Sequence, residues 1–373
     1  MKNSVWRLIY HWLVVHLYGI KSFRGGWLLT SYYIDDYKKH NVGYLQIIKT
    51  HLKGWCYFDW AAIGVTDETK DKYLKTRDYH SMHPFNGQYS FYIDDKLTLK
   101  YILSGTVCSH NMPDYYYCIE LDGSISPLMD LPFDIRDRYN DIEGILVLCK
   151  LKRALALKLT KGAIGKGFYK LEYNEGKFVL NGAEISEAET KEILKSLRGY
   201  LITELLYPHP EIAKYCDKSV GCLRYTLGKK MNGEWTIVSS FMRFGTNKSN
   251  AVENYGRGGV LVYPDNDGYY DGGFILDLDT WVSSRITHHP DNQIALKGKL
   301  PLWNEIRQIS KQLTNILSQN CYLGIDYCIT RDNQIKIIEI NSQTGLEAMQ
   351  LDKSVFETQA SSFFKERLSK VKK

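Results

Sequence analysis

The stretch that decides the fold is residues 324–350, GIDYCITRDNQIKIIEINSQTGLEAMQ. Two alternating runs flank the polar turn RDNQ, which predicts a β-hairpin. Glu339 and Asn341 are two residues apart and therefore point to one face of the second strand, where Asp326 of the first strand can lie opposite them. Such oxygen ligands suit Mg²⁺, which proteins hold with few ligands together with phosphate oxygens. For any one of the three residues alone, a solvated place on the hairpin is the simpler interpretation.

Composition places the chain among ordinary soluble globular proteins. Its 373 residues leave room for two or three domains, 44% of them are hydrophobic, and the mean hydropathy is -0.32. The formal net charge of +6 suits an anionic ligand, but no basic tract dominates, so we interpret the charge as dispersed and expect no nucleic-acid partner. The eight cysteines form no C-x-x-C and no zinc-like spacing with histidine. We therefore expect reduced thiols and a cytoplasmic protein.

The chain opens with an apolar stretch over residues 5–20. Hydrophobic residues recur there at helical spacing, at Val5, Leu8, Ile9, Trp12 and Leu13. They predict an amphipathic helix flanked by basic residues. Arg7, His11 and His16 interrupt the stretch, so it predicts neither a signal peptide nor a membrane span. We favour a helix packed on its own domain; the alternative is a basic helix on a membrane surface or on a membrane-bound partner.

A lysine followed by a glycine loop forms the second chemical motif. Lys158 lies near the end of a predicted strand over residues 154–159, and three glycines follow within six residues, Gly162, Gly165 and Gly167. Glycines let backbone amides approach phosphate oxygens, and the lysine adds a fixed positive charge. The motif is neither a Walker loop nor G-x-G-x-x-G. Alone, it is equally compatible with a flexible hairpin turn.

Other charged residues stand at defined places along the chain. Lys96 opens a helix behind the capping residues Asp94 and Asp95, while Arg224 and Arg243 lie on later strands. A guanidinium binds carboxylate or phosphate oxygens in pairs, although a surface salt bridge is the simpler interpretation of each arginine. The chain around them is predicted to hold helices over 97–103, 184–197 and 304–317, and strands over 115–121, 168–173, 200–206, 219–227 and 237–244.

Taken in order, these motifs resemble the ATP-grasp ligases. The second half narrows the resemblance, with R-x-T at Arg224, M-R-F-G at Arg243, E-N-x-x-x-G-G at Glu253, then H-P-D, P-x-W and E-I-N. This series is similar to the sugar-transfer-associated ATP-grasp group, which is related to the glutamate ligases of cell-wall teichuronopeptides. The resemblance covers about residues 90–352. Two departures are Lys158-Leu159 in place of lysine-proline, and Glu253 before Asn254 where the group has aspartate.

The resemblance implies a role for each set of residues. ATP phosphates would be held by Lys96, Lys158, Gly162, Gly165 and Gly167, and the adenine would be met by the backbone of Glu204, Leu205 and Leu206. Mg²⁺ would be held by Asp326, Glu339 and Asn341. Catalytic contacts to a carboxylate and its tetrahedral intermediate would come from Arg224 and Arg243, and other substrate contacts from Asn254, Arg257, Gly258 and Gly259.

The fold implied is α/β (α+β), an ATP-grasp fold with ATP and Mg²⁺ bound between subdomains. We expect a helical N-terminal region at 1–90, an ATP-grasp N-terminal part at 91–206 whose lid lies at about 145–206, and an antiparallel-sheet subdomain at 207–373. The implied enzyme is an ADP-forming carboxylate-amine ligase. Its acyl-phosphate intermediate would be captured by an amine, attaching an amino acid to a uronic acid in capsule or other surface-polysaccharide biosynthesis.

Two alternatives remain open at this point. The same scaffold could serve a kinase or a peptide ligase with another acceptor. The chain could also be a non-catalytic nucleotide-binding scaffold, associated peripherally with a membrane or with glycan assembly proteins. A complete set of metal ligands together with two phosphate lysines favours the enzyme.

Overall fold

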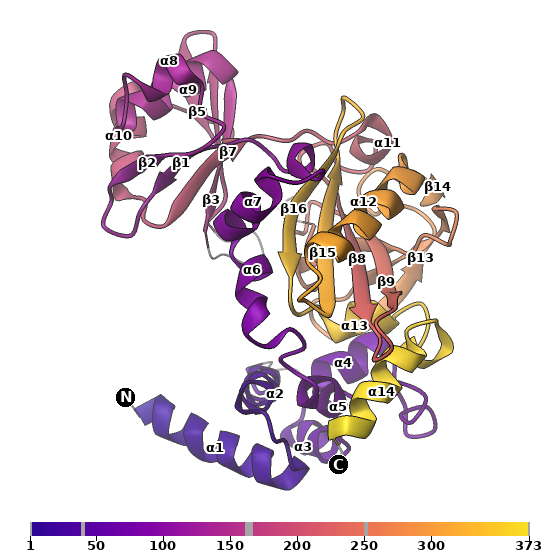
Figure 1. The fold of residues 1–373 in the computed structure, drawn as a ribbon. Coiled ribbons are helices and arrows are strands. Elements are labelled where there is room, and N and C mark those ends of the chain that lie inside the picture. Colours follow the sequence, from indigo (N-terminus) through magenta and orange to yellow (C-terminus); the bar gives the residue numbers. More distant parts are fainter. Residues whose placement is uncertain (1, 39–41, 161–166, 250–252, 372–373) are drawn as a thin grey trace.

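The computed structural model describes residues 2–38, 42–160, 167–249 and 253–371, with the side chains of 2–4 left out. The described chain begins with a helical end (Figure 1). Its elements are α1 (Lys2–Tyr18), α2 (Phe23–Asp36), α3 (Tyr44–Leu52), α4 (Tyr57–Ile63) and α5 (Thr76–Ser81). The elements η1 (Gly87–Ser90), α6 (Phe91–Asp94), α7 (Lys96–Ser104) and η2 (Ser109–Asn111) follow, and α6, α7 and η2 contact strand β16 (Ile335–Asn341). The predicted cap of α7 is confirmed, because Asp95 Oδ1 accepts the Thr98 amide at 2.9 Å.

A first antiparallel sheet forms the lobe at the top of Figure 1. Its strand order is β2-β1-β7-β3-β4-β5-β6. The strands are β1 (Tyr115–Ile119), β2 (Ile125–Pro127), β3 (Ala154–Leu159), β4 (Tyr169–Asn174), β5 (Lys177–Leu180), β6 (Ala183–Ile185) and β7 (Tyr200–Glu204), and the helices are α8 (Phe133–Arg136), α9 (Ile142–Lys152) and α10 (Glu187–Ser196). Its core joins Ile145 and Leu148 of α9 to Leu155 and Ile202 of the sheet. We call this lobe the lid.

The helix predicted over 184–197 is wrong at its start. Residues Ala183–Ile185 form strand β6, which returns along β5 through a turn at Asn181 and Gly182. Both turn residues have positive φ, 50° and 87°, as a two-residue hairpin turn requires. The helix begins only after Ser186, whose side chain forms a capping box with Glu189. Local turn and cap chemistry therefore shortened the expected helix.

A second sheet forms the centre of the molecule, in the order β13-β12-β10-β9-β8-β15-β16. Its strands are β8 (Cys222–Lys229), β9 (Trp235–Phe244), β10 (Val260–Val262), β12 (Gly273–Leu276), β13 (Ser283–Ile286), β15 (Tyr322–Ile329) and β16 (Ile335–Asn341). Around it lie α11 (Pro210–Ala213), η3 (Tyr255–Arg257), the two-stranded β11 (Tyr269–Asp271) and β14 (Lys297–Lys299), α12 (Trp303–Ile316), α13 (Leu346–Gln350), η4 (Val355–Glu357) and α14 (Ser361–Val371). We call this sheet the central sheet.

Side-chain alternation gives the central sheet two different faces. Leu223, Tyr225 and Leu227 of β8 pack with α7 and with Ile306 and Leu313 of α12. The alternate residues of β8, Arg224 among them, point to the opposite face. Period-2 burial therefore leaves charged side chains on the face that looks toward α13 and the helical end.

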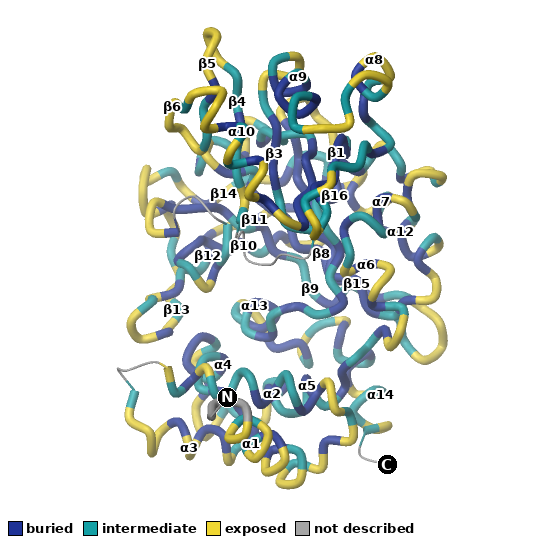
Figure 2. Tube along the Cα trace, turned by 90° about the vertical axis from the view of Figure 1, so that its left-hand side faces the viewer, coloured by how far each residue is buried: buried dark blue, intermediate teal, exposed yellow. Residues whose placement is uncertain are grey.

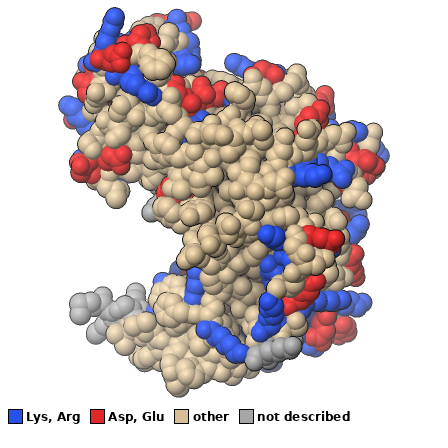
Figure 3. Space-filling model, viewed as in Figure 1, with Lys and Arg blue, Asp and Glu red and all other residues tan. Residues whose placement is uncertain are grey.

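The helical end is packed directly on the central sheet and its C-terminal helices. Gln350 of α13 hydrogen-bonds both the amide and the carbonyl of Leu74, at 2.9 and 3.0 Å. Tyr79 Oη donates to the Thr344 carbonyl at 2.8 Å, and Asn86 Nδ2 donates to the carbonyl of Tyr322 at 2.7 Å. The face shown in Figure 3 is hollowed between this end and the lid. Residues 1–90 therefore help to bound the hollow.

The N-terminal helix packs on the protein with a different face from the one that the sequence predicted. The predicted helix is present as α1, but the five apolar residues expected to pack inward are all 44–58% exposed. The side that packs on the protein instead holds His11 and Val14, which are buried. Periodicity identified the helix but not which of its faces meets the protein. Among the described residues, no helix combines the length and apolar character that a membrane crossing requires.

Candidate functional site

The hairpin of β15 and β16 places the predicted metal ligands on one face. Asp326 pairs directly with Glu339, and Gly324 with Asn341, as the alternating pattern predicted. Asn341 Nδ2 donates to Glu339 Oε1 at 3.1 Å, which leaves its amide oxygen available to a cation. The donor set is two carboxylates and one amide, and the described residues contain no group of three His, Cys, Asp or Glu side chains that could hold a metal. Mg²⁺ fits such a set only when phosphate oxygens complete its coordination.

Asp326 is the centre of a buried ion cluster. Arg224, its neighbour on β8, donates to it through Nε and also through Nη2, the latter at 2.7 Å. Arg243 on β9 adds a third contact, from Nη2 to Oδ1 at 3.0 Å. Burial would raise the pKa of Asp326, but the two guanidinium charges hold it below its ordinary value. Asp326 is therefore a permanent anion, shared between two permanent cations.

Arg243 has hydrogen-bonding capacity left over. Its Nη2 also donates to Cys222 Sγ at 2.7 Å, while its buried Nε has no hydrogen-bond partner among the described residues. A buried donor without a partner costs about 1–3 kcal/mol. An incoming anionic oxygen would remove that cost, which is what a substrate-binding arginine requires.

Two lysines approach the same hairpin from different elements. Lys96, at the start of α7, is 2.9 Å from Glu339 Oε2. Lys158 comes from β3 of the lid, with its Nζ 4.9 Å from the centre of the Tyr115 ring. Burial and the positive charge of Lys96 together lower the pKa of Lys158 to about 7, although the negative charge of Glu339 opposes the shift. Helix α7, the lid and the central sheet thus bring four predicted cationic residues close to two carboxylates.

The predicted adenine segment lies where β7 ends. Glu204 is the last residue of the strand, and Leu205 and Leu206 follow it, half-buried. The Glu204 carboxylate accepts the Asp114 amide at 3.2 Å and lies 3.9 Å from Lys336 Nζ. Because these contacts hold the Glu204 carboxylate, the backbone of Leu205 and Leu206 is the part of this segment that is able to contact adenine.

The glycine loop is described only in part. Gly162 and Gly165 lie outside the described residues. Gly167 has a φ of 71°, and a Cβ there would lie 2.7 Å from Tyr200 Oη, so the position requires glycine. Its role at phosphate stays a prediction.

The predicted substrate loop is a compact turn. The Asn254 carbonyl accepts the amides of Arg257 and Gly259, at 3.0 and 3.1 Å, and Gly258 has a φ of 94°. These contacts are internal to the turn, and its substrate role stays a prediction. Glu253, just before it, is electrostatically coupled to Arg243 and Asp326; burial raises its pKa, and Arg243 opposes the shift. Glu253 thus borders the ion cluster.

Sequence reasoning missed a pair of acids beside Arg224. Burial raises the pKa of Glu347 on α13 to about 7, with the charge of Asp59 adding to the shift and that of Arg224 opposing it. Asp59 on α4 accepts a hydrogen bond from Thr76 Oγ1 at 2.6 Å, but its buried Oδ1 has no partner within the described ranges. The only sequence signal was an acid inside the apolar run YFDWAAI, because Asp59 and Glu347 are brought together by tertiary packing alone.

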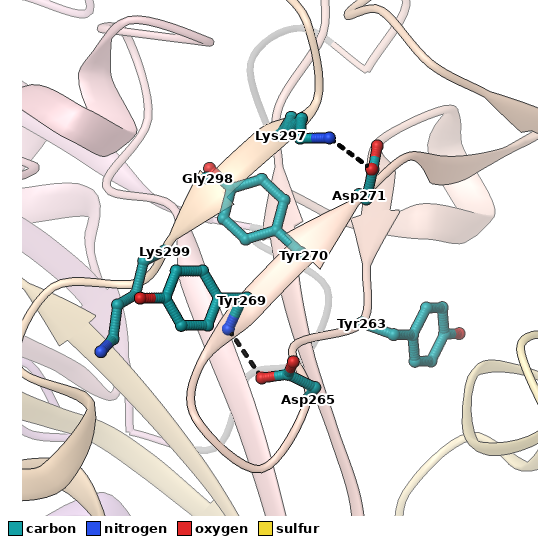
Figure 4. Close-up of a pocket in the computed structure, with 8 residues that line it drawn as sticks. All are labelled: Tyr263, Asp265, Tyr269, Tyr270, Asp271, Lys297, Gly298 and Lys299. Carbon is teal, nitrogen blue, oxygen red and sulfur yellow. Dashed lines mark hydrogen bonds and ion pairs between the residues drawn. The ribbon is translucent and has the colours of Figure 1, made fainter.

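A pocket elsewhere holds none of the predicted site residues. About 520 Å³ in volume, it is lined by Tyr263, Asp265, Tyr269, Tyr270, Asp271, Lys297, Gly298 and Lys299 (Figure 4). Lys297 pairs with Asp271 at 2.8 Å, so part of its charge is already neutralised. Tyr263 points away and donates to the Ala348 carbonyl at 2.7 Å. The charged cluster around Asp326, not this pocket, is the candidate active site.

The sequence matches the model of the family described as sugar-transfer associated ATP-grasp over residues 78–363. The chain belongs to this ATP-grasp family. Its mixed α/β architecture, with the lid sheet and the central sheet, is therefore the ATP-grasp fold, which binds ATP. The predicted family and fold are confirmed, and the family is one of ATP-grasp ligases associated with sugar transfer.

Solved ATP-grasp structures resemble this chain only distantly. D-alanyl-alanine synthetase A from Vibrio cholerae is 12% identical with a TM-score of 0.42, and covers 76% of this chain and 66% of its own. N5-carboxyaminoimidazole synthetase from Staphylococcus aureus, complexed with ADP, is 12% identical with a TM-score of 0.37, and the match covers 73% of this chain and 52% of the synthetase. L-amino acid ligase from Bacillus licheniformis is 12% identical with a TM-score of 0.38, and the match covers 75% of this chain and 48% of the ligase. This chain thus spans less than two thirds of their lengths. No curated protein matches the sequence.

Proposed function

We propose that this chain is an ADP-forming carboxylate-amine ligase that joins an amino acid to a uronic acid, or to a similar carboxylate, in surface-polysaccharide biosynthesis. The observation that carries the proposal is the ion cluster: Arg224 and Arg243 on Asp326, with Lys96 on Glu339 and Lys158 beside it. Among these six residues, four basic side chains stand against two carboxylates. Such an excess is what a nucleoside triphosphate and a substrate carboxylate need in one cleft.

The phosphate end of the cleft would be formed by the two lysines. Lys96 and Lys158 come from α7 and from the lid, so they can contact phosphate oxygens from two sides, and transfer then depends on positioning and charge neutralisation. Asp326, Glu339 and Asn341 would hold Mg²⁺, which neutralises charge on the phosphates. The hinge after Glu204 would receive the adenine.

The carboxylate end would be formed by the arginines. A substrate carboxylate oxygen attacks the γ-phosphorus, the bond to the β-phosphate oxygen breaks, and ADP leaves with that electron pair. The unpartnered Nε of Arg243 would receive the substrate oxygen, and Arg224 would hold Asp326 in place. The amine then attacks the acyl carbon and phosphate leaves. Closure of the lid would exclude water, which otherwise hydrolyses the acyl phosphate.

The amine must lose a proton as the amide forms. Glu347 is suited to accept that proton, because it adjoins Arg224 and its pKa lies near neutral pH.

We also propose that the chain is divided into a helical N-terminal region at 1–90, an ATP-grasp N-terminal part at 91–206 and a C-terminal subdomain at 207–373. We further propose a cytoplasmic location, with which the eight free thiols agree.

The test is ADP release from Mg-ATP by the purified full chain, with uronic acids or uronate-containing glycans screened against pools of amino acids. We expect ADP only when acid and amine are both present, and a product whose mass is the sum of the two less water. Glu339→Gln should abolish the activity. Glu305→Gln, at an exposed acid of α12, is the matched control and should leave it unchanged.

Two outcomes would overturn the proposal. A single hydroxyl-bearing substrate that gains a phosphate group would make the chain a kinase. Nucleotide binding without turnover on any acid and amine pair, and a cellular function that survives Glu339→Gln, would make it a scaffold.

A further inference from the structure

The outer face of α1 is apolar along its whole described length. Seven hydrophobic side chains on it are 44–71% exposed: Val5, Trp6, Leu8, Ile9, Trp12, Leu13 and Leu17. The inner face is the more polar one, since buried His11 bonds Thr30 Oγ1 at 3.2 Å and Arg7 Nη2 donates to Ser31 Oγ at 2.6 Å. A surface helix in water has the opposite arrangement. Exposed apolar surface of this extent marks an interaction site.

The neighbouring helices extend this surface. Phe23 of α2 is 71% exposed, and the outer side of α3 exposes Tyr44, Leu45, Ile48 and Leu52. The Tyr18 hydroxyl donates to the His51 carbonyl, and Tyr10 Oη lies 3.4 Å from His51 Nδ1, so α1 and α3 are fastened together. Both helices close the end of the molecule away from the lid (Figures 1 and 2). We call these exposed residues of α1, α2 and α3 the end face.

The net positive charge of the chain belongs to this end. Residues 1–58 contain eight Lys and Arg but two Asp, a formal charge of +6, while the remaining residues balance. The expectation of dispersed charge was therefore wrong. Asp36 is buried and accepts the Tyr57 and Phe58 amides at 2.6 and 3.1 Å, and Asp35 pairs with Lys38. At this end of the view in Figure 3, the left-hand part of the surface is largely uncharged with a few basic side chains, and acidic side chains lie toward the right.

We propose that the end face docks on a lipid bilayer that contains anionic lipid, with α1 lying in the plane of the interface. Apolar residues would enter the boundary between headgroups and acyl chains, and the indole rings of Trp6 and Trp12 suit the headgroup level. Lys21 and Lys49, both exposed, would meet anionic headgroups. A second copy of the chain is a poorer occupant, because residues 1–58 carry a net positive formal charge in each copy and would repel each other. Docking does not depend on the reaction proposed above.

Docking would also set where the candidate active site lies. The helices behind the end face are joined to the central sheet through Tyr79 and Thr344 and through Leu74 and Gln350. The hollow between lid and helical end would therefore open close to the bilayer (Figure 3). An acceptor anchored in that bilayer could reach it without leaving the membrane.

The test is co-sedimentation of the full chain with vesicles of phosphatidylcholine alone, or of phosphatidylcholine with 30% phosphatidylglycerol. We expect binding to the anionic vesicles that salt weakens. Trp6→Gln with Trp12→Gln should reduce it at least about tenfold, and Lys21→Gln roughly fivefold. The matched control changes Leu121→Gln and Phe133→Gln, two residues of the lid that are 83% and 78% exposed. It should bind like the unaltered chain.

Three results would overturn the proposal. The first is equal binding to both vesicle types, and the second is an equal loss of binding in the control and in the Trp6→Gln, Trp12→Gln variant. The third is that the chain does not bind vesicles and instead forms a dimer or a protein complex, which the tryptophan substitutions dissociate. Brominated phosphatidylcholine mixed with phosphatidylglycerol gives an independent reading. It should quench fluorescence in the unaltered chain more than in a Trp6→Phe, Trp12→Phe variant. ATP binding, measured in parallel, should be equal in all variants, so that failure of docking and failure of the proposed reaction are distinguishable.

Discussion

Replacing Asp326 by asparagine should destabilise the protein strongly, because it leaves two buried cations without their anion. Arg224 and Arg243 both contact the same carboxylate, Arg224 through two nitrogens and Arg243 at 3.0 Å. Removing one partner of a buried pair costs about 3–5 kcal/mol. The two guanidinium groups left behind would also repel each other, since like charges about 5 Å apart repel by about 3 kcal/mol at an effective dielectric of 20. We expect a net loss of about 3–5 kcal/mol of unfolding free energy.

The assay is urea unfolding at pH 7, followed by far-UV circular dichroism without nucleotide or metal. The matched control is Asp271→Asn, which breaks the exposed Lys297–Asp271 pair. That pair should contribute less than about 1 kcal/mol. In a double-mutant cycle, Asp326→Asn should cost at least about 2 kcal/mol less in an Arg224→Met background, where one buried cation is gone. If Asp326→Asn lost no more stability than Asp271→Asn, the buried ion cluster would not be the stabilising unit described here.

Two further predictions concern groups with shifted pKa values. ATP should bind more weakly as pH rises above 7, by up to about tenfold per pH unit, because bound phosphate favours protonated Lys158. Calorimetric titrations at pH 6.5 and 8.0 measure this change in affinity. Lys158→Arg should remove the pH dependence, and a dependence that persists in this variant would contradict the role of Lys158. The folded pKa of Glu347 is raised above its ordinary 4.5 to about 7, so the folded chain binds more protons than the unfolded chain between those values, and stability falls as pH rises through that window. The Glu347→Gln variant cannot lose stability in this way. Its unfolding free energy, measured in urea, should therefore rise by about 1–3 kcal/mol relative to that of the unaltered chain between pH 5 and pH 8. If the difference in unfolding free energy between the two proteins did not change with pH, the burial argument would be contradicted.

The sequence by itself determined those features that depend on local chemistry. Period 2 placed Asp326, Glu339 and Asn341 on one face, because alternate residues of a strand point the same way and the hairpin turn set the pairing. Asp95 capped the helix that starts at Lys96, as its side-chain oxygen allows. The series of motifs also identified the family. Where a local signal was overlooked, at Asn181 and Gly182, a strand was missed.

Only the tertiary structure decided which distant groups meet and which surfaces stay in water. Arg224 and Asp326 are 102 residues apart and pair because β8 lies beside β15 in one particular register. Asp59 and Glu347 become an acid pair only when α4 packs against α13. The apolar spacing of residues 5–13 identified a helix, but periodicity cannot tell whether its apolar face meets a core, because burial depends on every other element that competes for the same surface.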